Sequence, residues 1–579
     1  MGEASFQRPK EGLMRKVIPA LAVWCLVAVA CTSQEGDETD GEELTQITIL
    51  APDGPAGLDY EGEGIPVLES MTAIVNLVDS LIDYAPGGEN DDGVGLLNFD
   101  EFEGRLAESF EFDEGTLTWT FHLREDVVGC EGQTFNADDV IYTFQRAKSV
   151  TGTIPVGWFF GNVAGIDGFG PEVFEGETEL GDEVRKIDDY TVEIRQSDPP
   201  SQLFLPAMTI FGLGILDKET MEENATEEDP WSHDYNNNVN APGFGPYCLE
   251  RWDQGSEFVV RANPDYYRGA PPFDRIVFRE VPQSSNRLAA IRSGDAHLVE
   301  RLTPREYASL REDPGVEVAG VLGNENMFLH MNWNNPPFDD VQVRQAIAHA
   351  IPYEEIISTG YFGQAKKWEG HIPEIYPGFH RSNIQYDFDM DRGKELLADA
   401  GFPDGNGLDT FSPETFQLSY VAEKESTLGP IATILQSSLR ELGLPVELNP
   451  MPQSQFADRA FVKKDLPFAL DDQEKPDIVD AGYGITNAHI SEGSPANNTN
   501  YSNERIDEIA VLSRTETDPE TRQEMLAEAQ DILQRDLNWI PIVQFRTQWA
   551  FSPALTGIVW HAENSLRWFD LQPAPVPED

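Results

Sequence analysis

Patterns typical of β-strands and patterns typical of helices alternate along this 579-residue chain from about Leu44 onward, without an internal repeat of fixed period. Residues 45–50 and 117–123 alternate apolar and polar side chains, as strands with one buried face do. Asn136 is a candidate N-cap, followed by two acidic residues that favour a helix N-terminus. Strands and helices mixed in this way predict an α/β architecture, and the length is enough for two or three packed units.

The same alternation continues into the second half of the chain. We predict strands at residues 191–195, 258–261, 275–279 and 539–545. We predict helices after Asp339, near Tyr353 and after Asp518, where Pro519 occupies the first helical position. Stretches rich in turn residues predict loops at residues 87–95, 222–246 and 492–503.

The N-terminus has the pattern of an export signal. Arg15 and Lys16 precede an apolar run over residues 17–30, which ends at Cys31 and is shorter than the roughly 20 residues of a membrane-spanning helix. The four residues that end at Cys31 resemble a bacterial lipobox. We therefore expect a lipoprotein signal peptide over residues 1–30, a diacylated Cys31 and a flexible acidic tether over residues 31–44. A plain signal peptide cleaved nearby is the alternative, and translation starts at Met1 or Met14.

These signals predict an exported protein, anchored by lipid to the outer face of the cytoplasmic membrane, in the periplasm or at the cell surface. The chain has 40 basic and 102 acidic residues, a formal net charge of −62. Nucleic-acid binding needs clustered Lys and Arg, so we expect no nucleic-acid partner. Anionic lipid attracts basic segments, so we expect membrane contact through the lipid anchor only.

Two of the four cysteines, Cys130 and Cys248, lie outside the N-terminal signal region. In an oxidising compartment they can pair, and closing so long a loop would stabilise the fold by about 4–5 kcal/mol in the chain-entropy model. Two buried free thiols are the alternative.

Several motif blocks occur in a fixed order behind the signal. They are Leu106-Ala107-Glu108-Ser109-Phe110 and residues 117–124, residues 132–140, Gly243-Phe244-Gly245-Pro246-Tyr247 with residues 263–267, residues 287–295, and residues 332–350. In order and spacing these blocks resemble the extracellular solute-binding proteins of ABC transporters, family 5, which includes oligopeptide-, dipeptide- and nickel-binding proteins. The resemblance extends from about residue 100 to residue 545.

The resemblance implies an α/β, two-lobed, periplasmic-binding-protein-like fold of class II and peptide-binder type, with mixed sheets and a ligand cleft between the lobes. On this chain, lobe 1 would comprise residues 45–300, with an inserted subdomain at about 85–210, and residues 541–579. Lobe 2 would comprise residues 301–540, and the crossings would lie near residues 298–300 and 542–544. The implied function is capture of oligopeptides or dipeptides by cleft closure. The implied partners are an ABC permease and ATPase complex; the protein would be a monomer without a cofactor, and not an enzyme.

Candidate ligand-binding residues come from the segments that form the cleft in this family. They are Glu61, Glu63, Trp158, Lys367, Trp368, Asp472, Asp477, Asp480 and Tyr483. The acids could meet a ligand ammonium, Lys367 a ligand carboxylate, and the aromatic residues could line the cleft. Solvated surface or core packing is the alternative for each of them. The segment around Asp472 to Asp480 departs from the family's pattern, because it lacks the Trp and the Asp-Tyr-Pro-Asp-Pro motif.

Three other functions remain open from the sequence, one of which is a binding module that feeds a sensor rather than an importer. The same scaffold could bind an oligosaccharide or another small solute. A secreted hydrolase is less well supported, because the chain has no Gly-x-Ser-x-Gly elbow and no His-Glu-x-x-His motif. The nine histidines are dispersed along the chain, so we expect no metal site.

Overall fold

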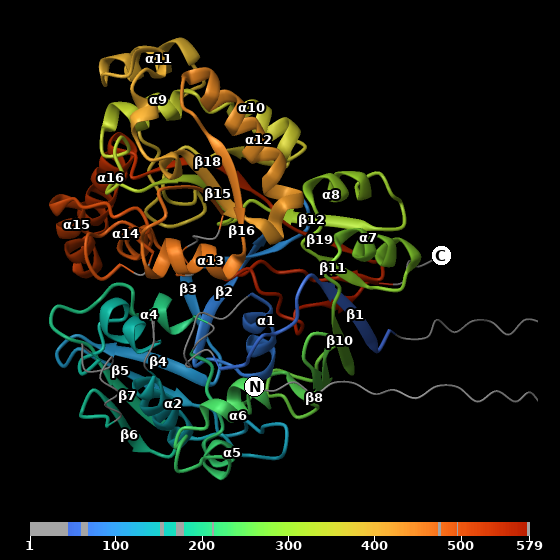
Figure 1. Cartoon of the computed structure of the whole chain (residues 1–579). Helices are drawn as coiled ribbons and strands as arrows, with labels where there is room; N and C mark the ends of the chain where they lie inside the picture. Colours follow the sequence, from blue (N-terminus) through green and yellow to red (C-terminus); the bar gives the residue numbers. More distant parts are fainter. Residues whose placement is uncertain are drawn as a thin grey trace, which may run out of the picture. The chain divides into compact units, whose positions relative to one another are not determined.

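Two mixed β-sheets, of seven and six strands, form the framework of the protein in the computed structural model (Figure 1). The structure describes residues 44–59, 68–150, 156–169, 179–210, 213–472, 476, 478–494 and 496–575. The described residues belong to one compact unit. The predicted signal peptide, the lipidation site Cys31 and the tether up to residue 43 lie outside the described residues.

The seven-stranded sheet is built around the first predicted strand. Its strands, in spatial order, are β12 (Glu317–Val321), β19 (Thr547–Phe551), β11 (Leu298–Glu300), β1 (Gln46–Ala51), β10 (Arg275–Glu280), β9 (Glu257–Ala262) and β8 (Tyr247–Asp253). β1 pairs in parallel with both β10 and β11, whereas the other pairs are antiparallel. Five of the six residues of β1 are buried, as expected for a central strand covered on both faces.

The six-stranded sheet lies in the second half of the chain. Its strands, in spatial order, are β14 (Ala365–Lys367), β18 (Trp539–Phe545), β13 (Asn326–Met331), β17 (Phe468–Asp471), β15 (Gln417–Val421) and β16 (Glu447–Met451). Every residue of β13 is buried. Helices α9 (Val341–His349) and α12 (Glu425–Leu442) supply apolar side chains to the core beside this sheet.

The chain passes between the two sheets twice. It leaves the seven-stranded sheet after β12 and enters the six-stranded sheet at β13, and it returns at Arg546, between β18 and β19. β19 pairs with both β11 and β12. By strand membership the chain therefore passes between the sheets at residues 322–325 and at Arg546, whereas the crossings predicted near residues 298–300 and 542–544 lie within β11 and β18.

A smaller, four-stranded sheet contains the motif blocks at residues 106–110 and 117–124. Its strands are β4 (Ala107–Asp113), β5 (Thr118–Leu123), β7 (Thr191–Arg195) and β6 (Val184–Asp188). Helix α2 (Ala137–Ser149) contacts this sheet, as Figure 1 shows. Asn136 caps α2 in a capping box with Asp139, which confirms the helix start predicted from the sequence. Two further strand pairs are β2 (Ile82–Glu89) with β3 (Gly95–Gly104), and β20 (Leu555–Thr556) with β21 (Gln572–Pro573).

The remaining helices lie between the strands. They are α1 (Leu68–Leu77), α3 (Val156–Trp158), α4 (Phe204–Met208), α5 (Lys218–Glu223), α6 (His233–Asn238), α7 (Ser284–Ser293), α8 (Pro304–Leu310), α10 (Tyr353–Glu355), α11 (Met390–Asp399), α13 (Gln453–Ala457), α14 (Ala481–Ala488), α15 (Glu504–Thr515) and α16 (Pro519–Asp536). Asp518 caps α16 as predicted, whereas the predicted loop 222–246 contains α6, and the predicted loop 87–95 contains the ends of β2 and β3.

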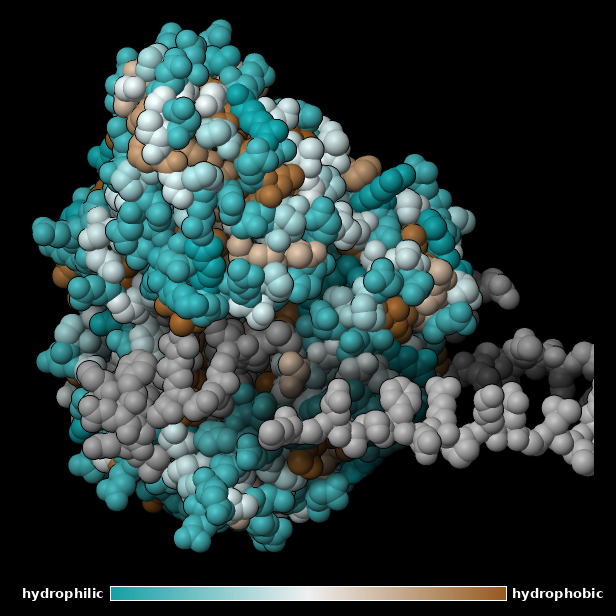
Figure 2. Space-filling model, viewed as in Figure 1, coloured by the Kyte–Doolittle hydropathy of each residue, from teal (hydrophilic) through white to brown (hydrophobic). Residues whose placement is uncertain are grey.

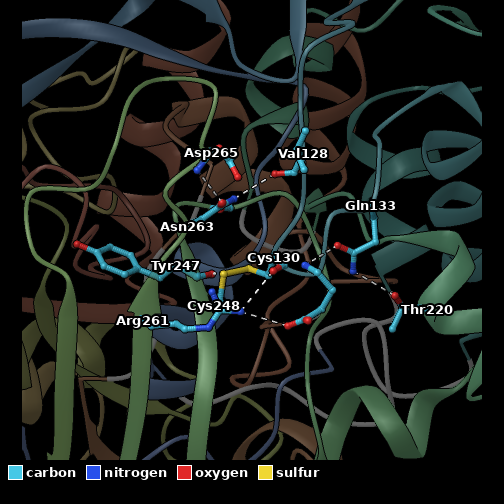
Figure 3. The surroundings of a disulfide bond; sticks show 11 residues. Val128, Cys130, Gln133, Thr220, Tyr247, Cys248, Arg261, Asn263 and Asp265 are labelled. Carbon is cyan, nitrogen blue, oxygen red and sulfur yellow. Dashed lines mark hydrogen bonds and ion pairs between the residues drawn. A yellow bond between two sulfur atoms is a disulfide. The ribbon is translucent and has the colours of Figure 1, made fainter.

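A disulfide joins Cys130 and Cys248 across 118 residues of sequence (Figure 3). Cys248 lies on β8, the edge strand of the seven-stranded sheet, and Cys130 lies in the loop that precedes α2. Two hydrogen bonds support the same junction: Arg261 Nη2 donates to Cys130 O at 3.3 Å, and Asn263 Nδ2 donates to Val128 O at 3.1 Å. The disulfide therefore holds this loop against the edge of the sheet.

The surface in view is mostly hydrophilic, with scattered hydrophobic side chains (Figure 2), in agreement with a net charge of −62. Within the part of the chain that the structure describes, no helix combines the length and the apolar composition needed to cross a bilayer.

Candidate ligand-binding site

An aromatic contact brings two of the sequence-predicted site residues together. A π-helical turn, η1 (Phe159–Val163), follows α3 directly. The Phe159 ring contacts Trp158 edge-on at 5.3 Å between centroids and lies 6.4 Å from the Tyr483 ring, at the start of α14. Trp158 and Tyr483 are both buried in the same hydrophobic cluster. This contact joins the inserted subdomain to the segment between β17 and β18 of the six-stranded sheet, and aromatic walls of this kind are common in ligand sites.

Asp480 lies beside this aromatic contact. Its carboxylate caps α14 by accepting hydrogen bonds from the Gly482 and Tyr483 amides at 2.7 and 3.2 Å. It also accepts a hydrogen bond from Arg522 Nη2 at 2.8 Å, and its side chain is 9% exposed. Asp480 therefore fixes the position of α14 and already has a cationic partner.

Of the other predicted acids, Asp472 is among the described residues. Asp472 follows β17 and forms an ion pair with Lys424 at 2.7 Å, so its charge is matched within the protein. Glu61, Glu63 and Asp477 lie outside the described residues, and their roles stay predictions.

Lys367 and Trp368 occupy a different place in the fold. Lys367 ends β14, where its ammonium pairs with Asp387 at 2.7 Å and lies 4.8 Å above the Tyr353 ring. Trp368 is 2% exposed and packs in a cluster with Phe328 and Trp539. These contacts give Trp368 a packing role and Lys367 an internal ion-pair partner.

A buried residue that the sequence did not suggest connects the crossing between β12 and β13 to the loop before α14. Asn324, fully buried between β12 and β13, donates from Nδ2 to Tyr376 Oη at 2.9 Å and to the carbonyls of Pro476 and Ala562. Tyr376 Oη also donates to Pro476 O. One amide thus ties the crossing to the loop that contains Asp472 and Asp480 and to the C-terminal segment.

A small polar cavity lies close to the same loop. It has a volume of about 10 Å³ and is lined by Asp83, Tyr84, Leu97, Thr209, Ile210, His561, Ala562, Glu563 and Arg567. Burial raises the pKa of the Tyr84 phenol above its usual range, with the Asp480 carboxylate adding to the shift, so Tyr84 stays protonated. A cavity of this size holds about one water, so in this conformation it could take a small polar group rather than a whole peptide.

Aromatic rings, capped helix ends and paired carboxylates can position and enclose a ligand. Among the described residues, no three His, Cys, Asp or Glu side chains gather closely enough to hold a metal ion. The sequence did not single out Tyr84, Thr209 and Glu563, which line the cavity, or Asn324, because no local pattern distinguishes them from ordinary strand and loop residues.

Comparison with known proteins identifies the class that this fold defines, a two-lobed α/β solute-binding protein. The family model described as bacterial extracellular solute-binding proteins, family 5 Middle, matches residues 101–473. The chain belongs to this family, which confirms both the resemblance seen in the motif blocks and the predicted fold class. The family consists of substrate-binding proteins of transporters, whose members work with ABC permease and ATPase components.

Two curated relatives and one solved structure illustrate the similarity. The dipeptide-binding protein of Escherichia coli (strain K12) is 29% identical over 315 residues, which is 53% of this chain and 56% of that protein. The probable D,D-dipeptide-binding periplasmic protein DdpA of the same organism is 24% identical over 465 residues, 80% of this chain and 83% of its own length. The periplasmic binding protein DppA from Helicobacter pylori, solved in complex with the peptide STSA, superposes with a TM-score of 0.76 at 21% identity, covering 93% of this chain and all of that one.

Proposed function

We propose that this protein captures dipeptides or oligopeptides outside the cytoplasm by closure of two lobes and delivers them to the permease of an ABC importer. In this proposal each large sheet with its helices forms one lobe, and the ligand lies where the lobes meet. The contact of Phe159 with Tyr483 carries the proposal. Phe159 belongs to the inserted subdomain of one lobe. Tyr483 belongs to the other lobe and comes directly after the segment, around Asp472 to Asp480, that forms part of the cleft in this family. Closure over a ligand would then be a shift between two arrangements of the lobes about the crossings beside Asn324.

The relatives named above supply the ligand class. Two of them are named for dipeptides, and the solved structure contains a peptide. The proposal further includes export, anchoring through a lipid on Cys31, action as a monomer, and binding without hydrolysis. The described acids of the loop, Asp472 and Asp480, already pair with Lys424 and Arg522, so a ligand ammonium would need another partner, such as Asp477 or the early Glu61 and Glu63.

A thermal-shift screen tests the ligand class directly. The purified protein is heated with a pool of dipeptides to pentapeptides, with a pool of oligosaccharides, or alone, because a ligand that binds the folded state raises the unfolding midpoint. The proposal predicts a higher midpoint with the peptide pool only, and full recovery of intact peptide by chromatography. A higher midpoint with the oligosaccharide pool only would assign the scaffold to sugars, and loss of intact peptide would indicate a hydrolase.

A further inference from the structure

One buried side chain, Asn564, forms hydrogen bonds at both places where the chain passes between the two large sheets. Its Nδ2 donates to Asn324 Oδ1 at 2.9 Å and to a carboxylate oxygen of Glu325 at 3.3 Å, in the crossing between β12 and β13. Its Oδ1 accepts a hydrogen bond from Thr547 Oγ1 at 3.1 Å. Thr547 begins β19 directly after Arg546, the second crossing. A single amide therefore links the two connections between the sheets.

Asn564 is itself held against the lobe that contains the seven-stranded sheet. Its Oδ1 also accepts a hydrogen bond from Trp560 Nε1 at 2.7 Å, and the Trp560 ring is buried in the same hydrophobic cluster as residues of strand β1. In the first crossing, Gly323 packs so closely on this ring that a Cβ atom there would lie 2.6 Å from it. Asn564 is 4% exposed and its backbone is left-handed, with a φ of +59°. A non-glycine residue persists in that conformation where the surrounding structure fixes it.

The hydrogen bonds of Asn564 continue through Asn324 to the other lobe. Asn324 Nδ2 donates to the carbonyl oxygen of Pro476 at 3.3 Å. Pro476 lies between β17 and β18, in the loop that leads to α14, where Tyr483 meets the Phe159 ring of the inserted subdomain. The connected hydrogen bonds thus run from the C-terminal segment, through the first crossing, to the candidate site, in an arrangement in which the two lobes touch.

Opening and closure of the lobes require the chain to change its conformation at the two crossings. A hydrogen bond that forms in only one of the two arrangements shifts the equilibrium toward that arrangement. We propose that Asn564 is a positioning residue that favours the closed arrangement by holding both crossings in the geometry described above. Because it acts on the lobes and not on the ligand, Asn564 changes the affinity for different ligands by the same factor. This inference rests on the proposed capture function and assigns control of closure to the C-terminal segment.

The experiment compares the wild-type protein with two glycine variants. Asn564→Gly removes the amide and retains a residue that adopts the left-handed backbone readily. Asn500→Gly is the matched control, because Asn500 has a φ of +57° and its Nδ2 donates to Asn332 Oδ1 at 3.0 Å and to Lys464 O at 2.9 Å, all within the lobe of the six-stranded sheet. Calorimetry measures the affinity of each protein for the dipeptide Met-Leu and for the tetrapeptide Ser-Thr-Ser-Ala. One fluorescent dye on each lobe measures the distribution of distances between the lobes without peptide.

Asn564→Gly is expected to weaken the binding of both peptides by the same factor, of up to about tenfold, which corresponds to the net loss of one or two hydrogen bonds. The distances between the ligand-free lobes should shift toward longer values in this variant. Asn500→Gly should lower the unfolding midpoint and change neither the affinities nor the distances.

Unequal changes for the two peptides, or an unchanged distance distribution in folded Asn564→Gly, would overturn the inference. If that variant does not fold, Thr547→Val removes only the hydroxyl that donates to Asn564, and the same two results decide. This second variant should show the same shifts at about threefold. Absence of peptide binding to the wild-type protein would instead contradict the proposed capture function, and the distances measured without peptide would still decide the inference.

Discussion

Arg522 donates a hydrogen bond of 2.8 Å from Nη2 to the carboxylate of Asp480, the residue that caps helix α14. The bond connects α16 to the start of α14, next to the aromatic contact of Phe159 with Tyr483. Asp480, which the sequence suggests as a ligand anchor, thus fixes helix α14 relative to helix α16. A substitution of Asp480 would affect ligand binding through the position of Tyr483.

Substituting Asp480 with alanine should destabilise the protein strongly. The change removes the cap of α14 and leaves the largely buried Arg522 without its partner, so we expect a loss of about 2–4 kcal/mol in the free energy of unfolding. Asp389 is the matched control, because it caps α11 with a hydrogen bond of 2.9 Å to the Arg392 amide on an exposed surface. Asp389→Ala should cost about 1 kcal/mol in urea unfolding. Equal losses in the two variants would contradict the structural role of the Asp480–Arg522 pair.

Removal of the disulfide should lower stability without changing the fold. The bond closes a loop of 118 residues, and the chain-entropy model gives about 5 kcal/mol for a loop of that length. We expect Cys130→Ser/Cys248→Ser to lose about 2–5 kcal/mol in urea unfolding, with an unchanged far-ultraviolet circular dichroism spectrum. Dithiothreitol should lower the midpoint of the wild type and leave that of the double variant unchanged. A double variant as stable as the wild type would contradict the prediction.

Two buried histidines should make the protein sensitive to acid. The rings of His371 and His489 lie 5.5 Å apart and both contact Trp539. Burial lowers the pKa of His371 to about 3 and holds that of His489 well below its usual value. The unfolded chain binds protons near pH 6.5 that the folded state does not, so stability is full above pH 6.5 and falls as the pH drops below it.

The expected slope is about 1.4 kcal/mol per pH unit for each histidine between pH 6 and pH 4. Urea unfolding at several pH values measures it. His371→Gln should show a shallower slope, whereas His122→Gln, at an exposed position on β5, should match the wild type. An identical slope in the wild type and His371→Gln would show that this histidine does not carry the effect.

Glu300 should have the opposite pH dependence to the histidines, because its contribution to stability decreases as the pH rises. It ends β11 in a buried position, where burial, with the Glu69 carboxylate adding to it and Arg301 opposing it, raises the pKa to about 7. The folded state therefore keeps a proton that the unfolded chain releases above pH 4.5, so this contribution is full below pH 4.5 and lost as the pH rises through 7.

Replacing Glu300 with glutamine keeps the shape of the side chain and removes its charge. We expect Glu300→Gln to exceed the wild type in unfolding free energy at pH 8 by about 1–3 kcal/mol, and to lose most of that advantage at pH 5. Glu317→Gln, at an exposed position on β12, should change stability by less than about 0.5 kcal/mol. A destabilised Glu300→Gln at pH 8 would mean that Glu300 is charged and paired in the folded protein.

The elements that the sequence predicted well are those with local signals. The caps Asn136 and Asp518 start α2 and α16 where expected, because a cap and the first turn of its helix are neighbours in sequence. The crossings between the sheets depend on the pairing of β19 with β12, two strands separated by more than two hundred residues. No local pattern records such a pairing, so the crossings could be derived only from the structure.

The candidate site was less predictable for the same reason. Lys367 and Asp480 were selected for their charge, yet their partners Asp387 and Arg522 are 20 and 42 residues away in sequence. Charge type alone does not show whether a side chain is free for a ligand or already paired. Trp158 and Tyr483 were selected as aromatic residues near the cleft, and their joint burial around Phe159 depends on a tertiary contact.

Calorimetric titration of the protein with peptides tests the central claim most directly. The account predicts that a dipeptide or short oligopeptide binds one site per chain, with a negative heat-capacity change from the apolar surface buried on closure. It also predicts that the peptide is recovered intact. A titration in which no peptide of two to five residues produces binding heat, while an oligosaccharide or another small solute does, would contradict it.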